Sequence, residues 1–233
     1  TTADLAWALL MATARRLVDA DAFTRAGKFK GWAPSLYLGH DIWGKTLGVV
    51  GFGRIGQAAA RRAQGFGMKV LYHDPSVEIS TLEGGLQVEP VSLERLLGES
   101  DFVTIHCPLL PATRHLIGAQ ELTSMKPSAI LINTARGPIV DEKALVSALQ
   151  EGRLAGAGLD VYEREPQIEP GLLELSQVVL APHIGSGSEE TRAKMAHMAV
   201  DAVIDLLSGK RPRHLVNPEA WEAWEAREAR GSS

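Results

Sequence analysis

A glycine-rich turn gives the chain its clearest chemical signature. The apolar run 47–50 leads into Gly51-Phe52-Gly53-Arg54-Ile55-Gly56, and a helical pattern starts at once. Gly51 permits a tight turn, Gly53 lets the backbone approach a pyrophosphate, and Gly56 lets the helix pack closely on the strand. Phosphates would bind at the helix N-terminus, where free N–H groups and the helix dipole favour negative charge. The turn therefore predicts a dinucleotide site.

An acidic residue indicates which dinucleotide is bound. Asp74 ends the next apolar run and lies 18 residues after Gly56, which is the spacing of a ribose-binding carboxylate. It would accept hydrogen bonds from both adenosine ribose hydroxyls and repel a 2′-phosphate. Pro75 and Ser76 supply no adjacent cation, so NAD is expected rather than NADP. The alternatives are a turn without ligand and an ordinary acidic surface turn.

Three further residue types could handle an acidic substrate. Hydride transfer between nicotinamide and the 2-carbon of an oxo acid needs a cation for the substrate carboxylate, an acid for the developing alkoxide, and a carboxylate that orients this acid. Arg136 offers a bidentate fork for the carboxylate. A histidine such as His183 can act as an acid near neutral pH. Glu163 and Glu165 are both candidates for the third role, and each candidate taken alone could be an ordinary loop residue.

Alternating apolar and helical patterns would position these residues. Short apolar runs predict buried parallel strands at 47–50, 69–72, 102–105, 129–132, 155–159 and 178–180, with helices at 54–65, 93–97 and 142–150. This alternation predicts an α/β fold with a doubly wound parallel sheet of the Rossmann type. Such a sheet binds ligands at the carboxyl ends of its strands. The candidate residues follow strands, as this architecture requires.

Capping residues predict where some helices begin and end. Asp141 is expected to cap the helix at 142–150, and Gly152 lies where that helix should stop. Ser188 is expected to cap a long helix that runs to about Leu207. At the start of the chain, an apolar helical pattern continues to Arg16 and Leu17.

Four motifs in order carry a family resemblance. They are His106-Cys107-Pro108-Leu109, Asn133-Thr134-Ala135-Arg136-Gly137, the segment 158–166, and Ala181-Pro182-His183-Ile184-Gly185-Ser186. With them, residues 1 to about 218 resemble the D-isomer-specific 2-hydroxyacid dehydrogenase family, and most of all its glyoxylate/hydroxypyruvate reductase (glycerate dehydrogenase) branch. The resemblance implies that Arg136, Glu165 and His183 are catalytic. It favours Glu165 over Glu163 because Glu165 directly precedes Pro166, and it disfavours formate because formate-oxidising members carry Gln at that position.

The resemblance also implies further cofactor contacts. Cys107 and Pro108 are expected on the adenosine side, Thr134 and Ala135 near the nicotinamide ribose, and Asp160 facing the carboxamide. The full set expected to bind NAD is Gly51, Phe52, Gly53, Arg54, Ile55, Gly56, Asp74, Cys107, Pro108, Thr113, Thr134, Ala135, Arg136, Asp160, His183 and Gly185.

Composition narrows the classes of partner and compartment. The formal net charge of −4 disfavours nucleic acid and anionic membranes, because neither surface attracts an acidic protein. No apolar run reaches the ~18 residues of a membrane span. Cys107 is the only cysteine, so no intrachain disulfide can form and a reducing, cytoplasmic location is expected. The other histidines show no ligand spacing, so no metal is expected.

The N-terminal residues predict an assembly and a domain boundary. Residues 1–45 combine the apolar helix with an arm, 27–45, that carries Trp32, Tyr37 and Trp43. This is more aromatic surface than a connector needs, so a homodimer is expected; the alternative is packing within the same chain. The dinucleotide-binding domain is expected at 1–186, with a C-terminal helix and tail at 187–233. By resemblance Thr1 falls at an interdomain helix, so most of a substrate domain of roughly a hundred residues is expected to be absent from this chain.

Two functions remain open on these observations. The first is an oxidoreductase that transfers a hydride between NAD(H) and a small 2-oxo or 2-hydroxy acid such as glyoxylate or hydroxypyruvate, with D-stereospecificity. The family also includes transcriptional corepressors in which the same fold recruits partners. The alternative is therefore a dinucleotide-sensing interaction module, and intact Arg136, Glu165 and His183 do not separate the two.

Overall fold

A computed structural model describes residues 1–77 and 86–231, with 228–231 described by their backbone alone. The chain divides into two compact units, Thr1–Gly185 and Ser186–Ser233. All residues expected to bind NAD or to act on substrate lie in the first unit. The two units are therefore considered separately.

The first unit is built on a seven-stranded sheet in which every strand pair is parallel. Its order is β3-β2-β1-β4-β5-β6-β7, so the chain moves outward from β1 in one direction and then returns to build the other half. The strands are β1 (Thr46–Val50), β2 (Lys69–His73), β3 (Glu89–Pro90), β4 (Phe102–Ile105), β5 (Ile130–Asn133), β6 (Gly156–Leu159) and β7 (Val178–Leu180). The predicted doubly wound α/β fold is confirmed.

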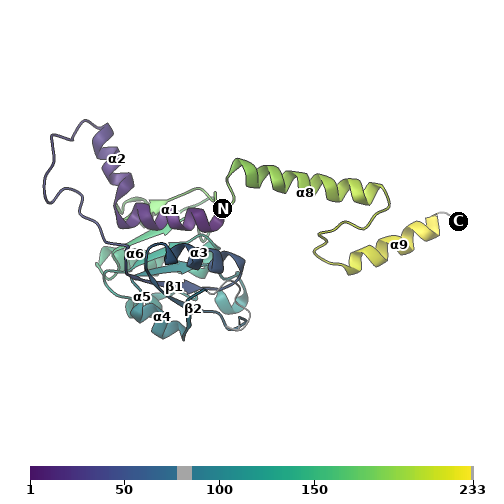
Figure 1. Cartoon of the computed structure of the whole chain (residues 1–233), viewed down its shortest axis with the longest axis horizontal. Coiled ribbons are helices and arrows are strands. Elements are labelled where there is room, and N and C mark those ends of the chain that lie inside the picture. Colours follow the sequence, from purple (N-terminus) through teal and green to yellow (C-terminus); the bar gives the residue numbers. More distant parts are fainter. Residues whose placement is uncertain (78–85, 232–233) are drawn as a thin grey trace. The chain divides into compact units, whose positions relative to one another are not determined.

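Helices cover both faces of this sheet, as Figure 1 shows for α1 on one side and α4 and α5 on the other. Buried side chains of α1 (Thr2–Ala14) and α3 (Arg54–Gln64) form one apolar cluster with the sheet. The opposite cluster takes side chains from α4 (Leu93–Glu99), α5 (Ala119–Ser124), α6 (Glu142–Gln150) and α7 (Pro170–Leu173). Continuous apolar strands are buried on both faces by this arrangement, which is why their sequences do not alternate.

The cap predictions are confirmed where they can be checked. The Asp141 side chain accepts a hydrogen bond from the N–H of Ala144 at 3.0 Å and begins α6. Gly152 follows the end of that helix with a φ of +68°. The Ser188 hydroxyl accepts from the N–H of Thr191 at 3.2 Å and begins α8 (Glu189–Leu207).

Other elements differ from the expectation. The helical pattern at the start breaks at Arg16, which has a φ of +52°, so α1 ends at Ala14 and a separate α2 (Leu17–Arg25) follows. Strands β5 and β6 each begin one residue later than expected. Neither β3, α5 nor α7 was predicted, because segments of two to six residues are too short to show a periodic pattern.

The arm at 27–45 contains neither helix nor strand, as its composition indicated. Two of its aromatic side chains are strongly exposed, Trp32 at 85% and Trp43 at 72%. Tyr37 packs instead within its own chain, edge-on against Phe23 with 5.2 Å between ring centroids. The expected aromatic surface therefore rests on the two tryptophans.

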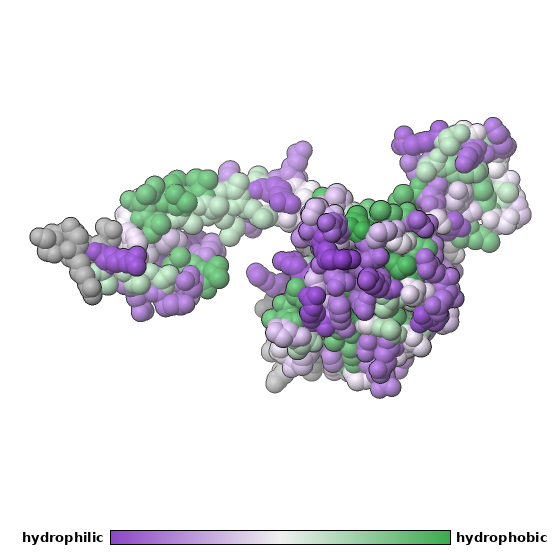
Figure 2. Space-filling view, turned by 180° about the vertical axis from the view of Figure 1, so that it is seen from behind, coloured by the Kyte–Doolittle hydropathy of each residue, from purple (hydrophilic) through white to green (hydrophobic). Residues whose placement is uncertain are grey.

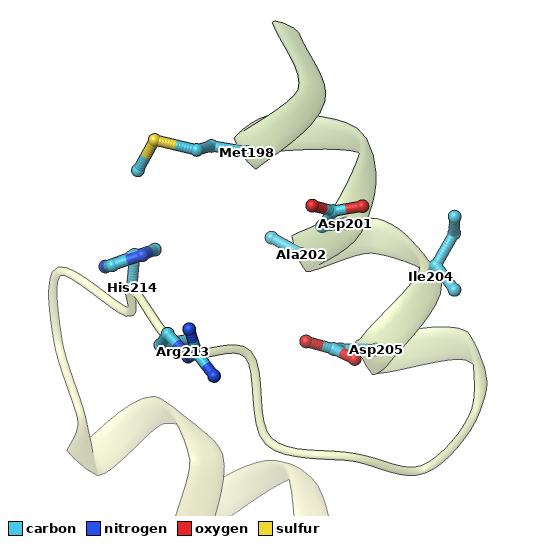
Figure 3. Close-up of a pocket in the computed structure, with 7 residues that line it drawn as sticks. All are labelled: Met198, Asp201, Ala202, Ile204, Asp205, Arg213 and His214. Carbon is cyan, nitrogen blue, oxygen red and sulfur yellow. The ribbon is translucent and has the colours of Figure 1, made fainter. Parts of the chain in front are cut away.

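The second unit consists of α8 and α9 (Glu219–Gly231) with a connecting segment. No residue of α8 is buried, and the apolar residues on its surface give the large green patches of Figure 2. They include Met195, Met198, Val200, Val203, Ile204, Leu206 and Leu207. A cavity of about 410 Å³ lies beside α8, with Asp201 and Asp205 opposite Arg213 and His214 (Figure 3). Within the described ranges, no helix is long and apolar enough to cross a membrane.

Candidate active site

The glycine turn has the packing that its three glycines predict. Gly51 follows β1 with a φ of +87°, and a Cβ there would collide with the backbone of Cys107 in the next loop. A Cβ on Gly56 would collide with the carbonyl of Gly51, so α3 can approach the turn only because that position is glycine. Gly53, the residue before α3, faces open space instead. The turn is closed against the protein on two sides and open where a pyrophosphate would lie.

Asp74 is held against this turn by backbone N–H groups. One carboxylate oxygen accepts from the N–H of Phe52 at 2.7 Å, and the other accepts from Ser76 at 2.8 Å. The ring of Phe52 is fully buried and stacks on Tyr72 with 4.1 Å between centroids. The structure therefore gives Phe52 a backbone role at the site, while Arg54 and Ile55 are exposed at the start of α3.

The loop after β4 forms the neighbouring wall. Burial raises the pKa of the Cys107 thiol to about 11, with a smaller contribution from the charge of Asp74, so this cysteine is protonated at neutral pH and is no nucleophile. The Thr113 hydroxyl donates to the carbonyl of Pro108 at 2.6 Å and accepts from the N–H of Leu110 at 2.8 Å. The hydroxyl of Thr113, a residue expected to bind NAD, therefore stabilises the conformation of this loop.

The loop after β5 presents Arg136, and a buried asparagine shapes it. Asn133 accepts from the N–H of Ala135 and donates to the carbonyl of Arg136, both at 3.0 Å. The guanidinium of Arg136 is exposed and donates to the carbonyl of Ala135 at 2.6 Å. Beside it, the hydroxyl of Thr134 is buried without a hydrogen-bond partner in the described residues. No role at the site was predicted for Asn133, although its position at the end of β5 could have indicated one.

His183 and Glu165 form the polar pair of the site. Nδ1 of His183 lies 2.8 Å from one Glu165 carboxylate oxygen, and the other oxygen accepts from the N–H of Tyr162 at 3.0 Å. Because a carboxylate only accepts hydrogen bonds, Nδ1 carries the proton and Nε2 is left for another partner. Glu163 binds a different histidine, His115, at 2.9 Å. The structure thus pairs His183 with Glu165 rather than with Glu163.

The ionised form of Glu165 is favoured by its surroundings. Burial acts to raise its pKa, but the hydrogen bonds from His183 and Tyr162 and the positive charges of His183 and Arg136 outweigh burial and lower the pKa below the ordinary value. The charge of Arg136 is among the causes that lower the pKa of Glu165. The three predicted catalytic residues come from the loops after β5, β6 and β7.

Asp160 links two of these loops. Its carbonyl accepts from the N–H of His183 at 2.9 Å, and one carboxylate oxygen accepts from Ile184 at 2.7 Å. The other oxygen is buried without a partner in the described part of the chain, 3.2 Å from where a Cβ on Gly185 would lie. Leaving such a group unpaired costs about 1–3 kcal/mol, which an amide or hydroxyl of a bound dinucleotide would relieve. Together with the open turn at Gly53, the residues present fit NAD.

A cavity adjoins the pair on its apolar side. It has a volume of about 430 Å³, and Glu165 and His183 contribute to its wall. The other lining residues are mostly apolar: Tyr162, Pro166, Ile168, Leu173, Leu180, Ala181 and Pro182. No sequence pattern predicts this cavity, because its lining comes from segments that meet only in the fold. Among the described residues, no group of three or more His, Cys, Asp and Glu side chains could hold a metal ion.

Comparison with known proteins agrees with this geometry. Residues 7–185 match the family model described as the D-isomer specific 2-hydroxyacid dehydrogenase NAD binding domain. A glyoxylate reductase of Korarchaeum cryptofilum is 56% identical over 222 residues, which are 94% of this chain and 66% of that protein. The chain thus spans about two thirds of the length of the curated relatives it matches.

Solved structures give the same assignment. The NAD complex of a D-isomer specific 2-hydroxyacid dehydrogenase from Lactobacillus delbrueckii ssp. bulgaricus has a TM-score of 0.80 at 30% identity, covering 93% of this chain and 69% of that one. An acyclic imino acid reductase in complex with NADPH and D-Arg has a TM-score of 0.79 at 32% identity, covering 92% and 67%. On its NAD-binding turn, its sheet order and these matches, the chain belongs to the D-isomer specific 2-hydroxyacid dehydrogenase family.

Proposed function

We propose that this chain provides the NAD-binding and catalytic half of a reductase for small 2-oxo acids such as glyoxylate or hydroxypyruvate, forming the D-2-hydroxy acid. The observation that carries the proposal is the hydrogen bond between His183 and Glu165, 2.8 Å long, beside the exposed Arg136. A dinucleotide-sensing module has no use for this pair but can retain its residues, so the pair alone does not separate the two functions. The similarity to a glyoxylate reductase favours catalysis over partner recruitment.

Arg136 would bind the substrate carboxylate. Its side chain is exposed and lies on a loop that Asn133 holds at two points. A guanidinium can bind a carboxylate through two parallel N–H bonds, which orients the adjoining carbonyl as well as attracting the acid. Because the substrate is held in one orientation, its reaction becomes effectively unimolecular, which lowers the barrier.

His183 would supply the proton. No hydrogen bond within the described residues engages its Nε2, so this atom is free to donate to the substrate carbonyl oxygen while Nδ1 donates to Glu165. The carboxylate of Glu165 stabilises the positive charge on the imidazole before the transfer. NADH, when bound along the turn at Gly51–Gly56, supplies the hydride to the carbonyl carbon. In the reverse direction His183 accepts the proton of the hydroxyl group.

Turnover assays test the proposal. Glyoxylate and hydroxypyruvate should oxidise NADH in the presence of the full-length protein, and formate should not reduce NAD because position 165 is Glu. NADH binding measured by fluorescence in the same preparation separates loss of cofactor binding from loss of chemistry. NADH binding without turnover of either oxo acid would contradict the proposed reaction and favour the sensing module.

We also propose that the protein is a cytoplasmic homodimer. Trp32 and Trp43 are strongly exposed on the arm, and aromatic surface of this kind is typical of interfaces. A single cysteine fits a reducing compartment. Light scattering at micromolar concentration should give twice the chain mass, and Trp32→Ser with Trp43→Ser should lower that mass. A monomer mass for the unaltered chain would contradict the dimer.

A further inference from the structure

Glu142 is a buried carboxylate for which the proposed chemistry has no use. It is the first residue of α6 and is only 4% exposed. One of its oxygens accepts from the N–H of Glu163 at 2.7 Å. Burial, with the charges of Glu163 and Glu169, raises its pKa, while interactions with the backbone of these two residues oppose the rise. A carboxylate is costly to bury, so its position calls for an explanation.

The backbone that Glu142 binds is the segment that carries Glu165. The N–H of Glu163, two residues before the catalytic glutamate, donates to Glu142, and the N–H of Tyr162 donates to Glu165 itself. Glu142 therefore fixes this segment close to Glu165.

The same contact reaches the loop of Arg136. Gly137, the next residue, packs so closely on the backbone of Tyr162 and Glu163 that a Cβ there would collide with it. Glu142 follows Gly137 by five residues, at the start of the helix that this loop leads into. The loop of Arg136, the first turn of α6 and the segment of Glu165 thus form one packed unit.

We propose that Glu142 is a positioning residue, which holds the segment 163–169 on α6 so that Glu165 stays aligned with His183 while Arg136 keeps its place beside them. The inference rests on the proposed function for its catalytic consequence only. The alignment itself is a property of the folded chain and can be measured without turnover.

A second attachment of the segment is weaker. The side chain of Glu163 pairs with His115 at 2.9 Å, but His115 is 39% exposed, and exposed pairs contribute little. The backbone hydrogen bond from Glu163 to Glu142 is expected to dominate, because Glu142 is only 4% exposed. A misplacement of about 1 Å in a catalytic arrangement costs on the order of a hundredfold in rate.

The test uses three variants of the chain. Glu142→Ala removes both acceptor oxygens, whereas Glu142→Gln keeps one and should retain part of the alignment. Asp101→Asn is the matched control, because Asp101 also accepts a backbone N–H, that of Thr46 at 2.9 Å, but at the amino ends of β1 and β4, away from the catalytic loops. All three are compared by circular dichroism, and if Glu142→Ala does not fold, the decision rests on Glu142→Gln.

The first readout is the ¹⁵N NMR signature of the His183 ring, assigned by its loss in His183→Gln. The unaltered chain and Asp101→Asn should show one tautomer with the proton on Nδ1. Glu142→Ala should show a mixture of both tautomers, and Glu142→Gln a smaller admixture. Signals identical to the unaltered chain in every folded Glu142 variant would overturn the proposal.

The second readout is catalysis with NADH and glyoxylate. Glu142→Ala should lower kcat about a hundredfold and Glu142→Gln about tenfold, with the Kd of NADH within twofold, while Asp101→Asn keeps kcat. Unchanged kcat in both Glu142 variants would overturn the positioning role. If the unaltered protein reduces no 2-oxo acid, the proposed function fails, and the tautomer signature still decides whether Glu142 aligns the pair.

Discussion

The cofactor turn and the catalytic loops solve the problem of placing functional groups in different ways. The turn and Asp74 belong to neighbouring strands, β1 and β2, and act largely through backbone N–H groups whose positions the sheet and α3 fix. Arg136, Glu165 and His183 act through side chains from three successive loops. The side chains of His183 and Glu165 are 49% and 36% exposed, and other residues hold their loops in place.

Because of this difference, we expect NADH binding at the turn and turnover at the catalytic loops to be lost through different substitutions. The turn depends on glycines that no other residue can replace, because a Cβ at Gly51 or Gly56 meets backbone. The catalytic loops depend on side-chain hydrogen bonds, which substitution can remove without disturbing the sheet. Substitution of the proton donor or its carboxylate partner should therefore alter turnover more than NADH affinity, and changes at Asp74 should do the reverse.

The largest separation is expected for His183→Ala. Loss of the proton donor should reduce turnover by about a thousandfold or more, since general acid catalysis contributes typically 10²–10⁴-fold. NADH affinity should change less than twofold, because His183 acts on the substrate oxygen. Steady-state kinetics and fluorescence titration measure the two effects, with His197→Ala on α8 as a control. A similar loss of NADH affinity in His183→Ala would contradict the separation of cofactor binding from catalysis.

Glu165→Gln should have a smaller effect and a diagnostic pH dependence. Turnover should fall about tenfold to a hundredfold. In the unaltered protein the lowered pKa of Glu165 keeps its carboxylate charged throughout the neutral range. Removing that charge disfavours the protonated form of His183, so the high-pH limit of reduction should move to lower pH. If the pH dependence of reduction did not move in this variant, Glu165 would not be the carboxylate partner of His183, and Glu163 would be the next candidate.

On the cofactor side, NADH should bind at least tenfold more tightly than NADPH. The reason is that Asp74 would face the 2′-phosphate with no cation at the following positions, Pro75 and Ser76, and tenfold requires only ~1.4 kcal/mol. The fold itself does not exclude NADPH, which a relative of this fold binds. Asp74→Asn should narrow the ratio of the two dissociation constants while leaving kcat with NADH almost unchanged. Equal or reversed affinities in the unaltered protein would refute the assignment.

The smallest expected effect is on the stability of the fold, and it comes from a second histidine, His106, after β4. Burial lowers the pKa of His106 to about 4, and its Nδ1 is buried without a partner among the described residues. Between this value and the ordinary 6.5 the unfolded chain binds a proton that the folded chain does not, so stability falls as pH falls. We expect a loss of about 1 kcal/mol between pH 7.5 and pH 6, measured by urea unfolding. His106→Asn should flatten this dependence, and an unchanged slope would contradict it.

Three features of the structure could not be predicted from the sequence, each for a physical reason: β3, α2 and the contact of Glu142. Strand β3 has only two residues. The start of α2 depends on the left-handed backbone conformation of Arg16, which no sequence pattern predicts. Glu142 lies in a recognisable helix start, yet nothing in the sequence indicates that it accepts hydrogen bonds from a segment more than twenty residues away. Contacts of this kind arise only when separate loops meet.

The parallel α/β fold, the nucleotide turn and the polar residues that end the strands can all be predicted from the amino-acid sequence. These depend on local rules, namely apolar runs that bury a strand, glycines required by close backbone approach, and side chains suited to caps. The tertiary structure decided which glutamate meets His183, which groups stay buried without partners, and how Glu142 joins the segment of Glu165 to α6. The reason is geometric, because the order of strands in the sheet brings together the loops after β5, β6 and β7, whose separation along the chain carries no record of their contact.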